Sequence, residues 1–246
     1  MESYKNKEKL LIAFDWAIKR LLKDKGNFEI VEGFISELLG RKVRITDVPE
    51  NEDDKSPFKN KPNSLDVMVE DEEGEIMLIQ LRFLMNIDQL NFQQMVYEVS
   101  KGVIEPMKHA RGDTILKLRK VCSINILYFD FGQGIDYVYH GRIDFEGMHS
   151  KEKIKSQREQ KEKYETMENV DLYPEYYLLL MNKFDDVINN TLAEWIYFLK
   201  HNKIEEGFSA QGLRKAKEVL DYSRLTPDEK ADHDSQQEIK RENYRS

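Results

Sequence analysis

Residues 64–83 of the 246-residue chain have the sequence SLDVMVEDEEGEIMLIQLRF. Apolar side chains recur at every second position in both halves of this stretch, and the residues between the halves are acidic and include Gly74. A period of two is typical of a half-buried β-strand, and glycine favours a turn. The stretch therefore predicts two strands joined by a turn.

The end of the second predicted strand is polar on one face. The period of two places four side chains on that face: Ile76, Leu78, Gln80 and Arg82. Two polar positions that end an apolar face are unusual for a purely structural strand. Asp66 lies on the first strand, and a carboxylate beside an amide and a cation is often found in metal-dependent phosphodiester chemistry. Asp66, Gln80 and Arg82 are therefore candidate catalytic residues, expected at a solvent-reachable edge of the sheet.

This pair of strands resembles the Asp…(Glu/Asp)-x-Lys hairpin of the PD-(D/E)XK nuclease superfamily. More narrowly, the chain resembles the PD-(D/E)XK family transposases, which are recombination-promoting nucleases. The likeness extends through segments that keep the family's order and spacing: 14–20, 34–40, 64–67, the helix with Met95, Tyr97, Ser100 and Lys101, 195–200 and 212–217. The resemblance implies an α/β fold with a restriction-endonuclease-like mixed β-sheet flanked by helices and a helical C-terminal extension.

The resemblance also implies a function, which is Mg²⁺-dependent DNA endonuclease activity in DNA recombination or transposition. DNA is then the partner, and Mn²⁺ is an alternative to Mg²⁺. The metal would be held by Asp66, by the side-chain oxygen of Gln80 and by the main-chain oxygen of Leu81. Arg82 would stabilise negative charge on the scissile phosphate.

Two positions depart from the family pattern, because Gln80 and Arg82 stand where the family usually has Glu and then Gln or Lys. An amide oxygen can bind Mg²⁺ but lacks the charge that a hard cation prefers, and arginine cannot act as a base. Metal affinity should therefore be lower. An inactive family member that binds nucleic acid or protein is the alternative function, and Arg82 could then be a buried charge partner of Asp66. A third hypothesis is a dimerising structural protein, which is a homo-oligomer whose exposed C-terminal helices pair.

Further candidates lie on two predicted helices. Lys19 and Arg20 could face a phosphate or could be surface charges. We expect a capping or orienting role for Asp15, whereas Glu32 could be an additional acid or a solvated charge.

Tyr97 and Lys101 are one helical turn apart and could contact a DNA backbone together. In the alternative interpretation, Tyr97 lies in the core and Lys101 in solvent.

Composition limits the class of protein. The net charge of −8 and the pI near 5.3 argue against a general nucleic-acid binder. No apolar run is long enough for a transmembrane helix, and the first residues lack a signal segment, so no membrane association is expected. The single cysteine, Cys122, fits a buried apolar position in a cytoplasmic protein, and the five histidines lack zinc-ligand spacing.

Periodicity and turn residues predict the order of the elements. Helices are expected over 7–39, with a break at Gly26 and an end at Gly40, and over 86–109 from an N-cap at Asn86. The expected strands, besides those in 64–83, are 42–48, 121–131 and 135–145, the last two joined as a hairpin at 132–134. A surface loop is expected over 49–63.

The predicted domain division falls at residue 150. Residues 1–150 would form the nuclease-like core. Residues 151–246 would form a charged connector, a strand at 173–184 and C-terminal helices at 191–200 and 209–220, packed on the core or extending from it. The polar residues from 221 onward are expected to fray.

Overall fold

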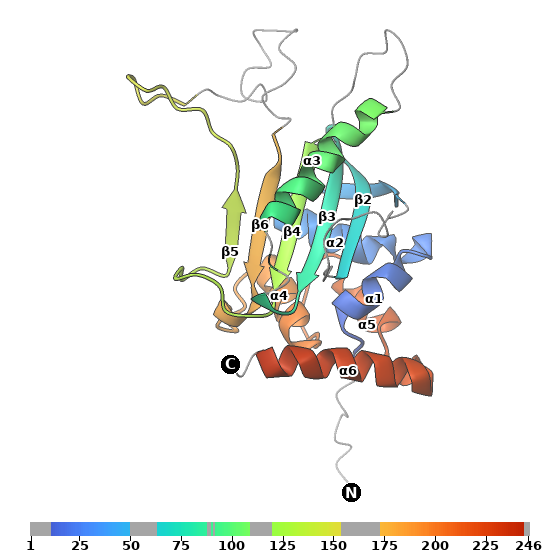
Figure 1. Ribbon diagram of the computed structural model, residues 1–246. Coiled ribbons are helices and arrows are strands. Elements are labelled where there is room, and N and C mark those ends of the chain that lie inside the picture. Colours follow the sequence, from blue (N-terminus) through green and yellow to red (C-terminus); the bar gives the residue numbers. More distant parts are fainter. Residues whose placement is uncertain are drawn as a thin grey trace, which may run out of the picture.

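The structure is a computed structural model that describes residues 11–49, 63–87, 90, 92–108, 120–153 and 173–243. Its centre is a six-stranded sheet with the order β1-β2-β3-β4-β6-β5 (Figure 1). The strands are β1 (Val43–Asp47), β2 (Asn63–Asp71), β3 (Ile76–Leu84), β4 (Lys120–Leu127), β5 (Val138–Gly141) and β6 (Glu175–Leu180). β4 is parallel to β3 and β6, and the other neighbours are antiparallel, so the expected mixed sheet is confirmed.

Helices cover both faces of the sheet (Figure 1). The α-helices are α1 (Phe14–Leu21), α2 (Phe28–Leu39), α3 (Phe92–Lys108), α4 (Thr191–His201), α5 (Leu213–Val219) and α6 (Pro227–Asn243). Short 3-10 helices span Lys25–Asn27, Met181–Lys183 and Tyr222–Arg224. α3 lies across one face, whereas α1, α2, α4 and α5 contribute to the core on the other.

The larger core contains an aromatic cluster between these helices and the sheet. The ring of Phe14 lies 5.7 Å from that of Trp195 and 6.2 Å from that of Phe83, centroid to centroid. Such edge-to-face contacts stabilise a core beyond the burial of apolar area. The segments around residues 14 and 195 therefore meet in one core.

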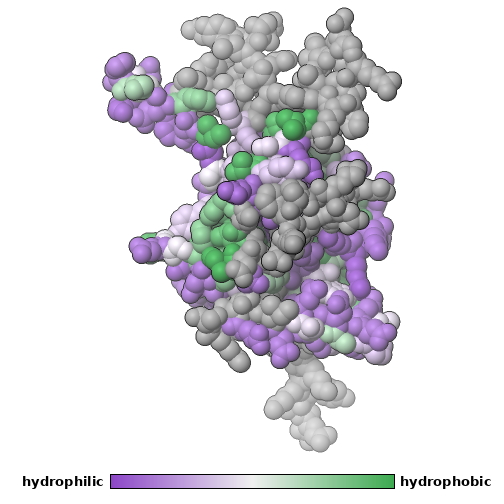
Figure 2. All heavy atoms as spheres, in the orientation of Figure 1, coloured by the Kyte–Doolittle hydropathy of each residue, from purple (hydrophilic) through white to green (hydrophobic). Residues whose placement is uncertain are grey.

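The face under α3 has two smaller apolar clusters. In the first, Val99 of α3 packs with Met68, Leu78 and Val121. The second, nearer the opposite strand ends, consists of Leu84, Leu127, Phe129 and Leu180. Most of the described surface in Figure 2 is hydrophilic, and apolar side chains gather beside β5.

The predicted hairpin of 121–131 with 135–145 is wrong. β6 lies between β4 and β5, and β5 pairs with β6. Every residue of β4 is buried, as expected for a central strand with helices on both faces, whereas β5 is a short edge strand. The glycine signal at 132–134 therefore indicated a loop but not the pairing of its flanking strands.

Several predicted boundaries are confirmed. Gly40 ends α2 in the left-handed conformation at a φ of 65°, and its N–H donates to the carbonyl of Ser36. Gly26 lies in the 3-10 segment that separates α1 from α2, and the strand predicted over 42–48 is β1. Asn86 is not an N-cap, because α3 begins at Phe92. Most of the loop predicted over 49–63 lies outside the described residues.

The C-terminal region departs from the prediction after residue 221. The two expected helices are α4 and α5, but the segment expected to fray contains α6. α6 lies along one end of the molecule (Figure 1), where the Ala13 N–H donates to His233 Nε2 at 3.1 Å and Trp16 Nε1 donates to Asp232 at 2.7 Å. Polar contacts hold this helix against the rest of the protein. Its sequence is therefore as polar as that of a solvated tail, which is why fraying was expected. The domain division at residue 150 stays a prediction.

Candidate active site

Asp66, Gln80 and Arg82 leave the sheet on the same face. Asp66 and Gln80 are direct partners between β2 and β3, and Arg82 follows Gln80 by two residues. Directly paired residues point to the same side of a sheet, and so do residues i and i+2 of one strand. The face is the one covered by α3, because Leu78 and Val99 belong to the same cluster.

These residues belong to a polar band between the two apolar clusters. The ladders place its members in two rows: Asp66, Gln80 and Ser123 in the first, and Ser64, Arg82 and Asn125 in the second. Asn125 Nδ2 donates to Ser123 Oγ at 3.1 Å and to the Tyr177 carbonyl at 3.4 Å. The band therefore extends over three neighbouring strands, one strand further than the sequence indicated.

The expectation of a solvent-reachable edge is wrong for two of the three candidates. Gln80 is 4% exposed and Arg82 is 6% exposed, whereas Asp66 is half-buried. The reason is the packing of α3, whose Glu98 carbonyl accepts a hydrogen bond from Gln80 Nε2 at 3.3 Å. The candidate site is therefore largely shielded by this helix.

Gln80 Oε1 is buried and has no hydrogen-bond partner in the described part of the chain. A buried acceptor without a partner costs about 1–3 kcal/mol. This orphaned oxygen fits a metal ligand, because hard divalent cations bind amide and carboxylate oxygens. Because Nε2 of Gln80 donates to the Glu98 carbonyl, the oxygen is the end of the amide that has no hydrogen bond.

Arg82 is a buried cation, and among the described residues it makes no hydrogen bond or ion pair. Burial lowers the pKa of its guanidinium, and the charges of Glu98, Asp66 and Tyr176 oppose this effect. Arginine nevertheless stays protonated in proteins. Burying the charge of a guanidinium is costly unless the charge is compensated, so Arg82 fits a site kept for an anion such as phosphate. The alternative, in which Arg82 is the charge partner of Asp66, stays a prediction.

A divalent cation could be held by the Asp66 carboxylate and by Gln80 Oε1. Leu81 is less suited, because its strand has hydrogen-bonded neighbours on both sides and its side chain lies in the larger core. Within the described ranges, no group of three or more His, Cys, Asp or Glu side chains could hold a metal ion. Amide or main-chain oxygens would therefore have to complete the ligand set.

A comparison with protein families agrees with this geometry. The family model of the PD-(D/E)XK nuclease family transposase matches residues 12–246. The chain belongs to this family. Neither the curated proteins nor the solved structures contained a match.

In this member of the family, the candidates on α1 and α2 lie apart from the polar band, because both helices pack on the opposite face of the sheet. Lys19 is exposed, and Arg20 pairs with Glu229 at 2.6 Å and stacks on Trp16. Glu32 accepts a hydrogen bond from the Ile45 N–H at 2.8 Å, which is a structural contact.

Asp15 is 1% exposed in the first turn of α1. A capping or orienting role for this carboxylate stays a prediction.

Tyr97 and Lys101 lie on α3, which also covers the polar band. Tyr97 is exposed, so its placement in the core is wrong. Lys101 Nζ lies 5.9 Å from the centre of the Tyr97 ring and 3.6 Å from Glu98 Oε2. The two residues are therefore adjacent on a surface beside the site.

Sequence reasoning missed Glu98, Ser123 and Asn125 in this PD-(D/E)XK family member. Ser123 and Asn125 did carry a signal, since they are two polar residues on one face of an apolar strand, as Gln80 and Arg82 are. Glu98 carried none, because any helix surface contains such glutamates and only packing brings this one to β3.

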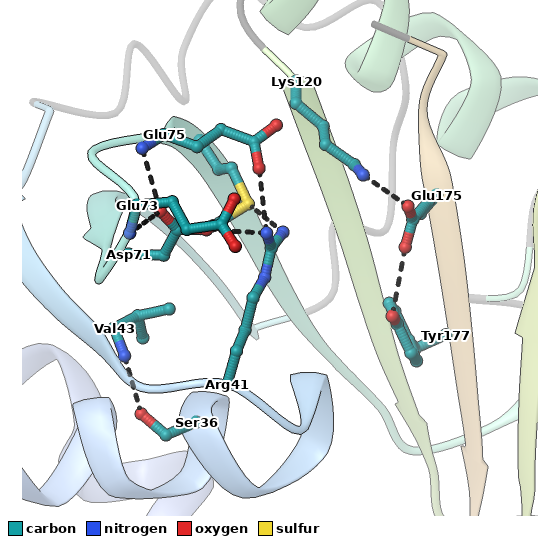
Figure 3. A network of polar contacts seen from close by, with 10 residues as sticks. Ser36, Arg41, Val43, Asp71, Glu73, Glu75, Lys120, Glu175 and Tyr177 are labelled. Atoms are coloured by element: carbon teal, nitrogen blue, oxygen red, sulfur yellow. Dashed lines mark hydrogen bonds and ion pairs between the residues drawn. The ribbon is translucent and has the colours of Figure 1, made fainter. Parts of the chain in front are cut away.

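A second polar network lies at one end of the sheet on the opposite face (Figure 3). Arg41 pairs with Asp71 at 2.7 Å and with Glu75 at 2.8 Å. Lys120 pairs with Glu175 at 2.5 Å, and Glu175 also accepts from Tyr177. These groups satisfy one another, so the network is a structural support for the strand ends.

Cys122 lies on the same face as this second network and is fully buried. Burial, together with the charge of Glu175, raises the pKa of its thiol to about 12. A thiol that stays protonated at neutral pH is a poor nucleophile, which supports its interpretation as a small apolar side chain.

No helix among the described segments is long and apolar enough to cross a membrane.

Proposed function

We propose that this protein is a Mg²⁺-dependent DNA endonuclease of DNA recombination or transposition, with Asp66, Gln80 and Arg82 in its active site. The proposal rests on the hydrogen bonding of two nearby residues on β3, Gln80 and Arg82. Gln80 has a buried oxygen without a partner, and Arg82, within the described chain, has a guanidinium without a hydrogen bond. A cation and a phosphate would satisfy both.

Asp66 and Gln80 Oε1 would hold the cation, with Mn²⁺ as an alternative and the Leu81 carbonyl as a further ligand. When bound, the metal supplies Lewis-acid charge at the phosphate and makes water a better nucleophile. Arg82 binds a non-bridging phosphate oxygen and stabilises the negative charge that develops during attack. It cannot accept the proton of the attacking water, which passes to a nearby carboxylate or to bulk base.

Tyr97 and Lys101 would bind the DNA backbone beside the site. Both lie on α3, next to the shielded residues, and lysine contacts phosphate without reading sequence. Lys19 would contribute a weaker contact from α1. Because α3 covers Gln80 and Arg82, productive binding requires this helix to shift away from β3.

The second candidate is an inactive family member that binds nucleic acid or a protein. The neutral Gln80, the burial of Gln80 and Arg82, and the net charge of −8 favour it. DNA binding that metal does not change, without cleavage, would support this candidate. No DNA affinity at low salt would favour a protein partner. Cytoplasmic location and homo-oligomer formation stay part of the proposal.

A plasmid assay tests the endonuclease. Wild type and the variants Asp66→Asn, Gln80→Glu and Gln80→Glu/Arg82→Lys are incubated with supercoiled DNA and Mg²⁺ or Mn²⁺. We expect metal-dependent nicking that Asp66→Asn abolishes and Gln80→Glu increases. If the Gln80→Glu/Arg82→Lys variant folds but leaves the plasmid intact, the scaffold is not competent for cleavage and the proposal fails.

A further inference from the structure

Glu98 of α3 faces the polar band of β3. Its main-chain carbonyl accepts the 3.3 Å hydrogen bond from Gln80 Nε2. Its side chain is only 20% exposed, and its negative charge acts on Arg82 more strongly than that of Asp66 does. A carboxylate on a different element therefore adds its charge beside the residues that sequence analysis had grouped.

The charges of the site make this carboxylate significant. The formal charges of Asp66 and Arg82 cancel, so Asp66, Gln80 and Arg82 together offer a divalent cation no net attraction. Adding Glu98 makes the set negative. Ca²⁺ and Mg²⁺ sites in proteins are built from oxygen ligands, and affinity rises with the number of charged ones.

We infer that Glu98 supplies the carboxylate that β3 lacks and binds the same cation as Asp66 and Gln80. The inference rests on the proposed function and assigns one more ligand to that site. The main chain of Glu98 contacts Gln80 at 3.3 Å, and the side-chain oxygen of Gln80 is buried and unbonded among the described residues. Lys101, 3.6 Å from Glu98 Oε2, is the counter-ion that a bound cation would displace toward a DNA phosphate.

Glu98 has one competing role, as a counter-ion of Arg82 without metal contact. Moving the carboxylate from position 98 to position 80 by mutation separates the two roles. If Glu98 is a ligand, Glu98→Gln should weaken metal binding, and Gln80→Glu in the same chain should restore it, because the charge returns to the same cation from β3. A counter-ion role predicts no such loss and rescue.

The experiment measures Mn²⁺ binding by electron paramagnetic resonance of the free ion, without DNA, on the full chain. The variants are Glu98→Gln, Glu98→Gln/Gln80→Glu and the control Glu218→Gln, whose side chain is 61% exposed on α5. We expect an affinity loss of about tenfold or more for Glu98→Gln, recovery in the double variant and no change in the control. Circular dichroism and metal-free melting show which variants are folded.

The outcomes are distinct. Wild type without measurable Mn²⁺ affinity overturns the metal-dependent function and this inference together. Wild-type binding that Glu98→Gln leaves unchanged overturns the inference alone. A loss that Gln80→Glu does not restore in a folded double variant also overturns it, because Glu98 would then support the site without binding the ion.

Discussion

Asp66 and Gln80 oppose each other directly in the antiparallel ladder of β2 and β3. Opposed residues on one face have Cβ atoms about 4.5–5.5 Å apart, which is within the reach of two ligands on one cation. The pair therefore sets the position of the proposed metal, whatever residue provides the other ligands.

Replacing Gln80 with glutamate should strengthen metal binding. The change adds a charge opposite Asp66 without altering side-chain length, so Mg²⁺ affinity should rise about tenfold. Isothermal titration calorimetry at neutral pH measures it. Gln236→Glu, the same change at an exposed position of α6, is the matched control. Equal or weaker binding by Gln80→Glu would contradict the placement of the cation at this residue.

Replacing Arg82 with methionine should separate stability from function. Because the buried guanidinium has no hydrogen bond in the described structure, an apolar side chain of similar size should leave the free energy of unfolding unchanged or raise it by about 1 kcal/mol. DNA affinity at low salt should fall. Urea unfolding and a DNA-binding titration measure the two effects.

The matched control for Arg82→Met is Arg44→Met, at an exposed position of β1. A loss of several kcal/mol in Arg82→Met alone would mean that Arg82 is a structural charge partner of Asp66 or Glu98.

Gly33→Ala should unfold or strongly destabilise the protein. A Cβ at Gly33 of α2 would lie 2.1 Å from the Gln211 carbonyl oxygen, so the segment before α5 would have to move away from α2. We expect a loss of about 3 kcal/mol or more in urea unfolding. Gly26→Ala, where the nearest atom belongs to the side chain of Asp24 at 3.2 Å, should cost much less. Similar losses for both would contradict the close contact.

Glu175 should make stability depend on acidic pH. Burial would raise the pKa of its carboxyl, but Lys120 and His140 outweigh this effect and lower it below the ordinary 4.5. A lowered folded-state pKa stabilises the protein fully above the unfolded value. The stabilisation is then lost as the pH falls from about 4.5 through the folded pKa.

Melting curves between pH 7 and pH 3 measure this effect. Glu175→Gln should lower the melting temperature at pH 7, because Lys120 stays buried without its charge partner, and should flatten the acidic decline. Asp228→Asn, at an exposed position of α6, is the control. An unchanged acidic decline in Glu175→Gln would assign the pH dependence to other carboxylates.

Local patterns predicted much of the fold. The alternation in 64–83 predicted β2 and β3, and Gly40 marked the end of α2, because both signals depend on residues close in the chain. The pairing of β4 with β5 failed because strand neighbours depend on contacts over long separations. The prediction that the segment of α6 would fray failed for a related reason. His233 and Gln237 are buried by contacts with the ends of α1 and α4, which composition does not reveal.

The sequence by itself determined that Gln80 and Arg82 share a face, because side chains two residues apart on a strand point to the same side. The register of β2 and β3 in the structure adds Asp66 to that face, because a shift by one residue would turn it away. Only the tertiary structure decided that Gln80 and Arg82 are shielded and that Glu98 lies beside them. The position of a helix over a sheet follows from the packing of Val99 with Leu78 and Val121, which no local period encodes.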